Sequence, residues 1–228
     1  MSTYFSDVAS LFDQFDVAAA FWVNIQLTFF AAIGSMLVGT VLALMRICPI
    51  PSMRWVGAAY VNIIRNTPLT IILVFLVLGM WSQLHMNLST DFDQNFFRYA
   101  VIGLVVYHAA FVCEAIRSGV NTVPVGQAEA ARAIGLSFLP AARLIILPQA
   151  LRGAITPLGN TLIALTKNTT VAAAASVTEI SALMKSMIEF RPDVIIVIFV
   201  MVALGFVLIV VPVGLLTTWA SRKFAVVR

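Results

Sequence analysis

The sequence predicts an all-α integral membrane protein, and its composition and charge distribution are the grounds for that fold class. Of its 228 residues, 61% are hydrophobic and only 11% are charged, whereas soluble domains carry about 25% charged residues. A helix needs about 20 predominantly apolar residues to cross a bilayer. Three stretches contain no charged residue over at least that length: those between Asp16 and Arg46, between Arg65 and Asp91, and between Asp193 and Arg222.

Two shorter apolar segments supply the remaining predicted spans. Residues 99–113 are closed by Glu114, and residues 153–166 are closed by Lys167. A spanning helix at either place must bring an ionisable residue to membrane depth or to its rim, which is costly. We predict five transmembrane helices in a single transmembrane domain of residues 1–228, at roughly 18–45, 58–82, 98–117, 150–170 and 194–217.

The charges of the loops predict the orientation. The N-terminal arm carries three aspartates and no basic residue, the loop after the first span carries Arg46 and Arg54, and the next loop carries Asp91 and Asp93. The central loop and the C-terminus are basic again. Because Lys and Arg accumulate in cytoplasmic loops, we expect an extracytoplasmic N-terminus and a cytoplasmic C-terminus. The loop before the fifth span has mixed charge and tests this rule weakly.

Motifs of catalysis and cofactor binding are missing from the sequence. There is no P-loop, no H-E-x-x-H and no G-x-S-x-G pattern, and the two cysteines, Cys48 and Cys113, do not have ligand spacing. His85 and His108 are the two histidines, and a lone histidine is more often a packing residue than a catalyst. We therefore expect no enzyme activity, no metal and no cofactor in this chain. We see no concentrated basic face that would indicate nucleic-acid binding.

A short charged insert interrupts the apolar sequence at residues 126–153, which read GQAEAARAIGLSFLPAARLIILPQALRG. Pro124 near its start, the run of strong helix formers and Gly135 as a stop predict a helix. Ala128, Ala131 and Gly135 share one face at i, i+3 and i+7, and small residues allow another surface to approach closely. We expect this helix to dock into a protein groove. An amphipathic helix on the membrane surface is the alternative.

The insert also carries a family motif. Glu129-Ala130-Ala131, three residues, Gly135, nine residues and then Ile145-Ile146-Leu147-Pro148 resemble the EAA loop of ATP-binding-cassette importer permeases. The resemblance implies a type I permease core in which loop 118–149 is cytoplasmic and contains the coupling helix that fits a groove of the ATPase subunit. The residues carried over by the motif are Glu129, Ala130, Ala131, Gly135 and Leu136.

The resemblance extends over nearly the whole chain except the N-terminal arm. IIRNTPLTIILVF, FVCEAIRSGVNTVPVGQAEAARAIGL and IILPQALRGAITPLGNTLIALTKNTTVAAAASVTEI are similar to the His/Glu/Gln/Arg branch of amino-acid permeases, and most similar to actinobacterial glutamate permeases. This implies a bacterial cell-membrane importer of polar amino acids, glutamate first, with ATP hydrolysis on a partner chain. Its partners would be an ATP-binding subunit, a second permease subunit, homologous or identical, and an extracytoplasmic amino-acid-binding protein. The alternatives are a permease for glutamine, arginine or histidine, and a scaffold or channel without an ATPase.

The first candidate for the substrate pathway is Arg65-Asn66-Thr67. Pro68 removes a backbone donor and disfavours helical geometry at Thr67, so carbonyls and polar side chains can face a cavity. An arginine at membrane depth is costly and is usually paired or directed at a polar pathway. In the alternative interpretation Arg65 extends its side chain to the inner interface.

The other candidates lie in and after the fourth span. Lys167, with Thr169 beside it, could offer a cation and a hydroxyl to a substrate carboxylate, and Asn160 lies at mid-span. Lys167 could instead anchor a helix end or pair with Glu114 or Glu179, and Asn160 could hold helices together. For Glu114 we expect an i,i+3 pair with Arg117, with binding of a substrate ammonium group as the alternative.

Overall fold

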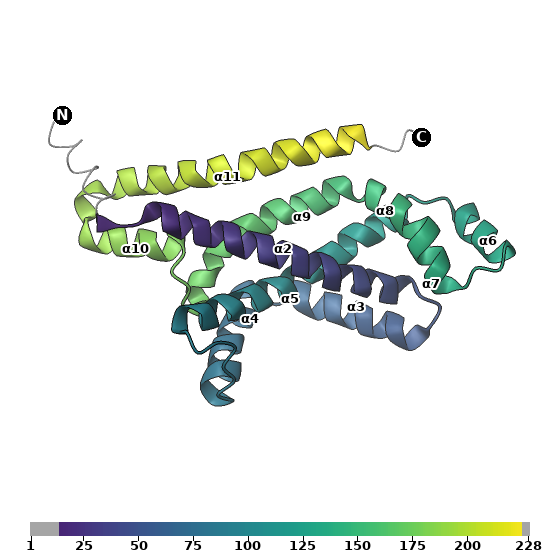
Figure 1. Cartoon of the computed structure of the whole chain (residues 1–228), viewed down its shortest axis with the longest axis horizontal. Coiled ribbons are helices and arrows are strands. Elements are labelled where there is room, and N and C mark those ends of the chain that lie inside the picture. Colours follow the sequence, from purple (N-terminus) through teal and green to yellow (C-terminus); the bar gives the residue numbers. More distant parts are fainter. Residues whose placement is uncertain (1–13, 225–228) are drawn as a thin grey trace. The chain divides into compact units, whose positions relative to one another are not determined.

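A computed structural model describes residues 14–224, and no β-strand occurs in that range. The N-terminal aspartates Asp7 and Asp13, which contributed to the predicted orientation, lie outside the described residues. The α-helices shown in Figure 1 are α2 (Val17–Ile47), α3 (Pro51–Arg65), α4 (Leu69–Phe75), α5 (Phe92–Val120), α6 (Val125–Ala133), α7 (Phe138–Ala141), α8 (Leu147–Gly153), α9 (Ile155–Asn168), α10 (Ile180–Phe190) and α11 (Ile195–Lys223). Segments Leu76–Gln83 and Ala142–Ile146 are π-helical, and Thr169–Ala175 and Pro192–Val194 are 3₁₀-helical.

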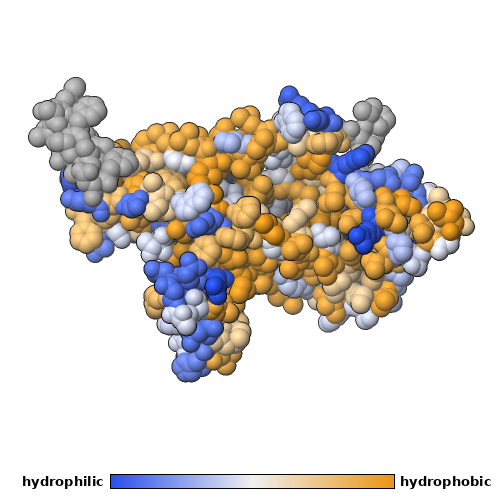
Figure 2. Space-filling model, in the orientation of Figure 1, coloured by the Kyte–Doolittle hydropathy of each residue, from blue (hydrophilic) through white to orange (hydrophobic). Residues whose placement is uncertain are grey.

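Three helical segments of the described chain are long and apolar enough to cross a membrane: α2, α5 and Pro192–Lys223. Two pairs, Pro51–Arg65 with Leu69–Gln83 and Phe138–Gly153 with Ile155–Ala175, pass the same test together but bend at a short break. Five crossings result if each bent pair is one span. Figure 2 shows that apolar residues cover much of the visible surface, as a lipid environment requires.

The contacts between residues divide the chain into two compact units. The first consists of Met1–Ala31, Leu69–Leu104 and Leu165–Pro212, and the second consists of Ala32–Pro68, Val105–Ala164 and Val213–Arg228. The predicted coupling helix and Arg65 both belong to the second unit.

The core of the first unit is formed where α10 packs against α2 and α11. Its buried members are Val17, Ala20, Ile180, Met187, Val194, Ile198 and Val202. Lipid tails are as apolar as these side chains, so in a membrane close packing, rather than removal from water, holds such helices together. The small Ala20 within this cluster fits that requirement.

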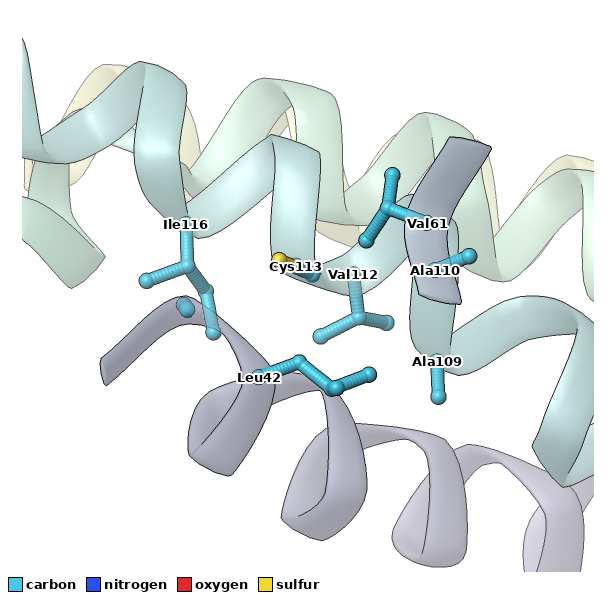
Figure 3. Packing of buried hydrophobic residues seen from close by; sticks show 8 residues of the cluster. Leu42, Val61, Ala109, Ala110, Val112, Cys113 and Ile116 are labelled. Carbon is cyan, nitrogen blue, oxygen red and sulfur yellow. The ribbon is translucent and has the colours of Figure 1, made fainter. Parts of the chain in front are cut away.

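The core of the second unit joins α2, α3 and α5. Figure 3 shows Leu42 of α2 and Val61 of α3 against a face of α5 formed by Ala109, Val112, Cys113 and their neighbours. Gly39 makes this approach possible, because a Cβ atom there would lie 2.6 Å from the Cβ of Val112. The tight α2–α5 contact positions the ends of both helices, which carry Arg46 and Glu114.

Candidate functional site

A helix is present as α6 where the sequence predicts the coupling helix, and its end is built around Gly135. The N–H of Leu136 donates to the carbonyl of Ala131 at 3.0 Å, and the N–H of Gly135 donates to that of Arg132 at 2.9 Å. This pair of bonds is the Schellman motif, which requires a left-handed residue after the helix. Gly135 has a φ of +85°, and a Cβ there would meet nothing within 4 Å. The glycine is therefore needed for its backbone conformation.

The faces of α6 differ from the expected arrangement. Ala131 is only 1% exposed, so it lies against its own unit and is not free to contact a partner. Our expectation that the face containing Ala131 docks onto another protein needs correction. Glu129 and Ala130 are exposed, and Val125 and Ile134, at the two ends of the helix, are each 74% exposed. The surface of α6 that is available to a partner contains these residues.

A cluster of charges lies at one end of the second unit's core. The Arg46 guanidinium donates to Oε1 of Glu114, the Arg117 Nε lies 3.4 Å from Oε2, and an Arg65 Nη lies 4.0 Å from Oε1. One carboxylate thus faces three guanidinium groups, and the cluster has an excess of two formal positive charges. The predicted Glu114–Arg117 pair is confirmed. Because Glu114 is already surrounded by cations, its assignment to a substrate ammonium group is not favoured.

Sequence reasoning missed the role of Arg46 in this cluster. The signal was available, because Arg46 closes the first predicted span and Glu114 closes the third, and the positive-inside rule places both ends on the same side. Spacing along the chain could identify only the neighbour Arg117.

The break predicted at Pro68 is present between α3 and α4. Asn66 Nδ2 donates to the carbonyl of Asn62, and Thr67 Oγ1 donates to that of Ile63, at 2.7 and 2.8 Å. Both side chains thus add hydrogen bonds to carbonyls of the last turn of α3, and the carbonyl of Ile63 also accepts from the N–H of Asn66. Arg65 is 46% exposed and its guanidinium carbon lies 5.6 Å from the ring centre of Phe111. Of the three predicted pathway residues here, Arg65 and Asn66 are exposed and Thr67 is partly buried.

Asn160 and Lys167 share an exposed stripe of α9. Thr156, Asn160, Ala164 and Lys167 are the exposed residues of this helix, at i, i+4, i+8 and i+11, which places them on one face. Within the described residues, neither Glu114 nor Glu179 forms an ion pair with Lys167. A polar stripe on a membrane helix is costly in contact with lipid. It therefore indicates a face directed to another subunit or to an aqueous pathway.

Thr169 does not belong to that stripe. It is fully buried, accepts a hydrogen bond from Asn24 Nδ2 at 2.9 Å and donates to the carbonyl of Thr166 at 2.7 Å. The structure does not show the Thr169 hydroxyl open to a substrate, because it is buried in the first unit, where it donates one hydrogen bond and accepts another.

The same buried network contains Glu179, which sequence reasoning considered only as a partner for Lys167. Asn24 Nδ2 donates to its Oε2 at 3.0 Å, and the N–H groups of Ser181 and Ala182 donate to the carboxylate at 2.9 and 3.1 Å. Glu179 therefore caps α10 and joins it to α2. Burial raises the pKa of this carboxyl, and the hydrogen bonds that it accepts only partly offset the desolvation.

No group of three or more His, Cys, Asp or Glu residues could hold a metal ion between residues 14 and 224. The candidate sites in the described chain are the exposed surface of α6, the arginine cluster around Glu114 and the exposed stripe of α9.

Comparison with known proteins identifies the family. Residues 35–226 match the family described as "Binding-protein-dependent transport system inner membrane component". The chain therefore belongs to this family and is the permease component of an importer driven by a separate ATP-hydrolysing subunit. Family membership makes it a multi-pass membrane protein and implies, as partners, an ATP-binding subunit, another permease subunit and a substrate-binding protein.

Individual relatives are similar along the whole chain. A glutamate transport system permease protein of Corynebacterium efficiens is 48% identical, with 99% of each chain covered. A protein of the same name from Corynebacterium glutamicum is 46% identical, also with 99% of each chain covered. The fold is similar to a crystal structure of an amino acid ABC transporter with histidines, with a TM-score of 0.77 and 25% identity, over 97% of both chains.

Proposed function

We propose that this member of the family is the permease subunit of a glutamate importer. Its full-length similarity to two corynebacterial proteins named as glutamate transport permeases carries the choice of substrate. Glutamate has a net negative charge at neutral pH, and burying an extra carboxylate needs compensation. Lys167, an exposed cation of the first unit, would supply it, and Arg65, in the second unit, is a separate candidate.

The exposed surface of α6 is the proposed contact with the ATPase subunit. Glu129 and Ala130 lie at the centre of that surface, and Val125 and Ile134 provide apolar area at its two ends. Ala131 seats the helix on its own unit, and Gly135 with Leu136 closes its C-terminus. Closure of the ATPase would then move α6 together with the permease unit and would drive alternating access.

The polar stripe of α9 is the proposed substrate pathway of this chain. A second permease subunit, homologous or identical, would face this stripe, so that Asn160 and Lys167 border a polar passage rather than lipid. An extracytoplasmic amino-acid-binding protein would deliver the substrate. The chain would lie in a bacterial cell membrane, with its N-terminus extracytoplasmic and its C-terminus cytoplasmic.

The test is ATP-driven uptake of labelled glutamate by proteoliposomes that contain this chain with its ATPase, second permease and binding protein. Competition by aspartate, glutamine, arginine and histidine determines selectivity. Replacement of Lys167 with Met should reduce uptake at least about tenfold, because a hydrogen bond to a charged group contributes roughly 1.5–3 kcal/mol.

Lys185→Met is the matched control. Lys185 is an exposed lysine of α10 without an acidic partner in the described chain, so its replacement should leave uptake within about twofold of wild type, as expected for surface substitutions. Equal uptake by the two variants would remove Lys167 from the pathway. Preferential uptake of a different amino acid would reject glutamate as the substrate.

A further inference from the structure

The second unit contains a cavity of about 810 Å³ behind the coupling helix. Its walls are the turn between α2 and α3, the loop after α5, one face of α6, and α7 with the segment that follows it. Val125, Ala128 and Arg132 of α6 line it at i, i+3 and i+7, and Leu136 lines it from the turn after Gly135. Glu129 and Ala130 are not among the lining residues. This volume lies in the range of small-molecule sites, about 300–1,000 Å³.

The position of the cavity along the helices corresponds to the membrane surface. Ile47, the last residue of α2, and Val120, the last residue of α5, both line it. These two apolar helices are long enough to cross the bilayer, so the cavity lies where they leave the hydrocarbon region. Trp55, next to the lining residue Arg54, is 73% exposed, and exposed tryptophan is enriched at the headgroup level.

The lining combines apolar walls with two cations. Between residues 14 and 224, Arg54 and Arg132 are the charged residues that line it, and no acidic residue does. Both arginines are exposed, and within the described residues neither forms an ion pair. Two uncompensated guanidinium groups beside an apolar cavity are complementary to a molecule with an anionic head and an apolar body. Basic pockets at the cytoplasmic ends of membrane helices bind anionic lipid headgroups on this basis.

We propose that this cavity binds an anionic phospholipid of the surrounding membrane, with its phosphate at Arg54 and Arg132 and its upper acyl chain against the apolar walls. A lipid is favoured over an acidic side chain of the ATPase because the cavity begins at the ends of two spanning helices and because most of its lining is apolar. Since Arg132 is on α6 and Arg54 is on α3, a lipid bound to both arginines holds α6 near the turn between α2 and α3. The inference does not depend on the transported substrate.

The test is native mass spectrometry of the complete transporter, purified in detergent and titrated with phosphatidylglycerol or with phosphatidylcholine of the same acyl chains. Wild type should retain phosphatidylglycerol preferentially. Arg54→Gln should weaken this binding roughly fivefold, because each basic residue near an anionic lipid raises the affinity by about that factor. The two factors multiply, so the double variant Arg54→Gln with Arg132→Gln should weaken binding about 30-fold. Arg54→Lys, which keeps the charge, should restore most of the binding.

Arg143→Gln is the matched control, because Arg143 is an exposed arginine of the same unit that does not line the cavity. If Arg143→Gln and Arg54→Gln lost phosphatidylglycerol binding equally, the lipid would be attracted by the basic surface in general and not by this cavity, and the proposal would be overturned. An absence of preference for phosphatidylglycerol, or its displacement by millimolar inorganic phosphate, would also overturn it. Unchanged lipid binding with weaker retention of the ATPase in Arg54→Gln would assign the cavity to an acidic segment of that partner.

Discussion

Gly135 offers the most direct test of the proposed coupling role of α6, because the structure separates backbone conformation from steric fit at this position. Its φ is +85° and a Cβ would meet nothing within 4 Å. Gly135→Ala therefore introduces no clash, and its cost is the left-handed conformation of an L-residue, roughly 1–2 kcal/mol. That cost lowers the ratio of capped to uncapped α6 by about 5- to 30-fold. A helix of nine residues has little stability of its own, so the cap matters.

The assay measures glutamate transported per ATP hydrolysed, in proteoliposomes with all partner subunits. We expect Gly135→Asn to be mildest, because Asn adopts the left-handed conformation more readily, Gly135→Ala to be intermediate and Gly135→Val to be most damaging. Gly126→Ala is the control, since Gly126 is exposed within α6, has an ordinary φ and has open space around it. There alanine should be neutral or stabilising. If Gly135→Asn were as uncoupled as Gly135→Val, or if Gly126→Ala were equally uncoupled, the backbone explanation would be wrong.

Three further changes test the packing and charge of the two units by thermal unfolding of the purified complex. Glu114→Gln should lower the free energy of unfolding by about 1 kcal/mol, the scale of a partly exposed ion pair. Adding Arg46→Met should recover part of that loss, and no recovery would show that the two residues are not energetically coupled. Burial raises the pKa of Glu179, so the stability from its protonated form is fully present below the unfolded pKa of about 4.3 and is lost as pH rises through the folded value. The stability of wild type relative to Glu179→Gln should therefore fall with rising pH across that window, and a flat difference would contradict this. Gly39→Ala should cost about 1–3 kcal/mol, because its Cβ meets Val112 at 2.6 Å; unchanged unfolding would show that α2 and α5 can separate without loss.

The local features of the fold were predictable because their causes are local. Apolar length predicted the helices, Pro68 predicted the break after α3, and helix-forming residues followed by Gly135 predicted α6 and its end. The same holds for the pair of Glu114 with Arg117, which lie one turn apart on one helix. In each case the residues that determine the feature are within a few positions of one another.

The features that sequence reasoning missed depend on contacts between distant segments. Asn24 and Glu179 are separated by 155 positions, and nothing in either neighbourhood indicates that they meet inside the first unit. Ala131 illustrates the same limit within a motif: the resemblance indicated that the residue matters, but only the packing of α6 determines that it faces inward. A family motif therefore identifies important residues without separating those that touch a partner from those that hold the helix in place.

That separation suggests how the coupling helix transmits movement. Its outward surface carries Glu129 and Ala130, while its inward surface carries Ala131 against the unit and Arg132 at the cavity. A force applied by the ATPase at the outward surface can reach the membrane helices only if the inward surface does not yield. Close packing at Ala131 resists displacement, whereas an empty cavity beside Arg132 would permit it. A bound lipid would fill that volume, so coupling efficiency should depend on the anionic lipid content of the membrane in wild type and should lose that dependence in Arg54→Gln.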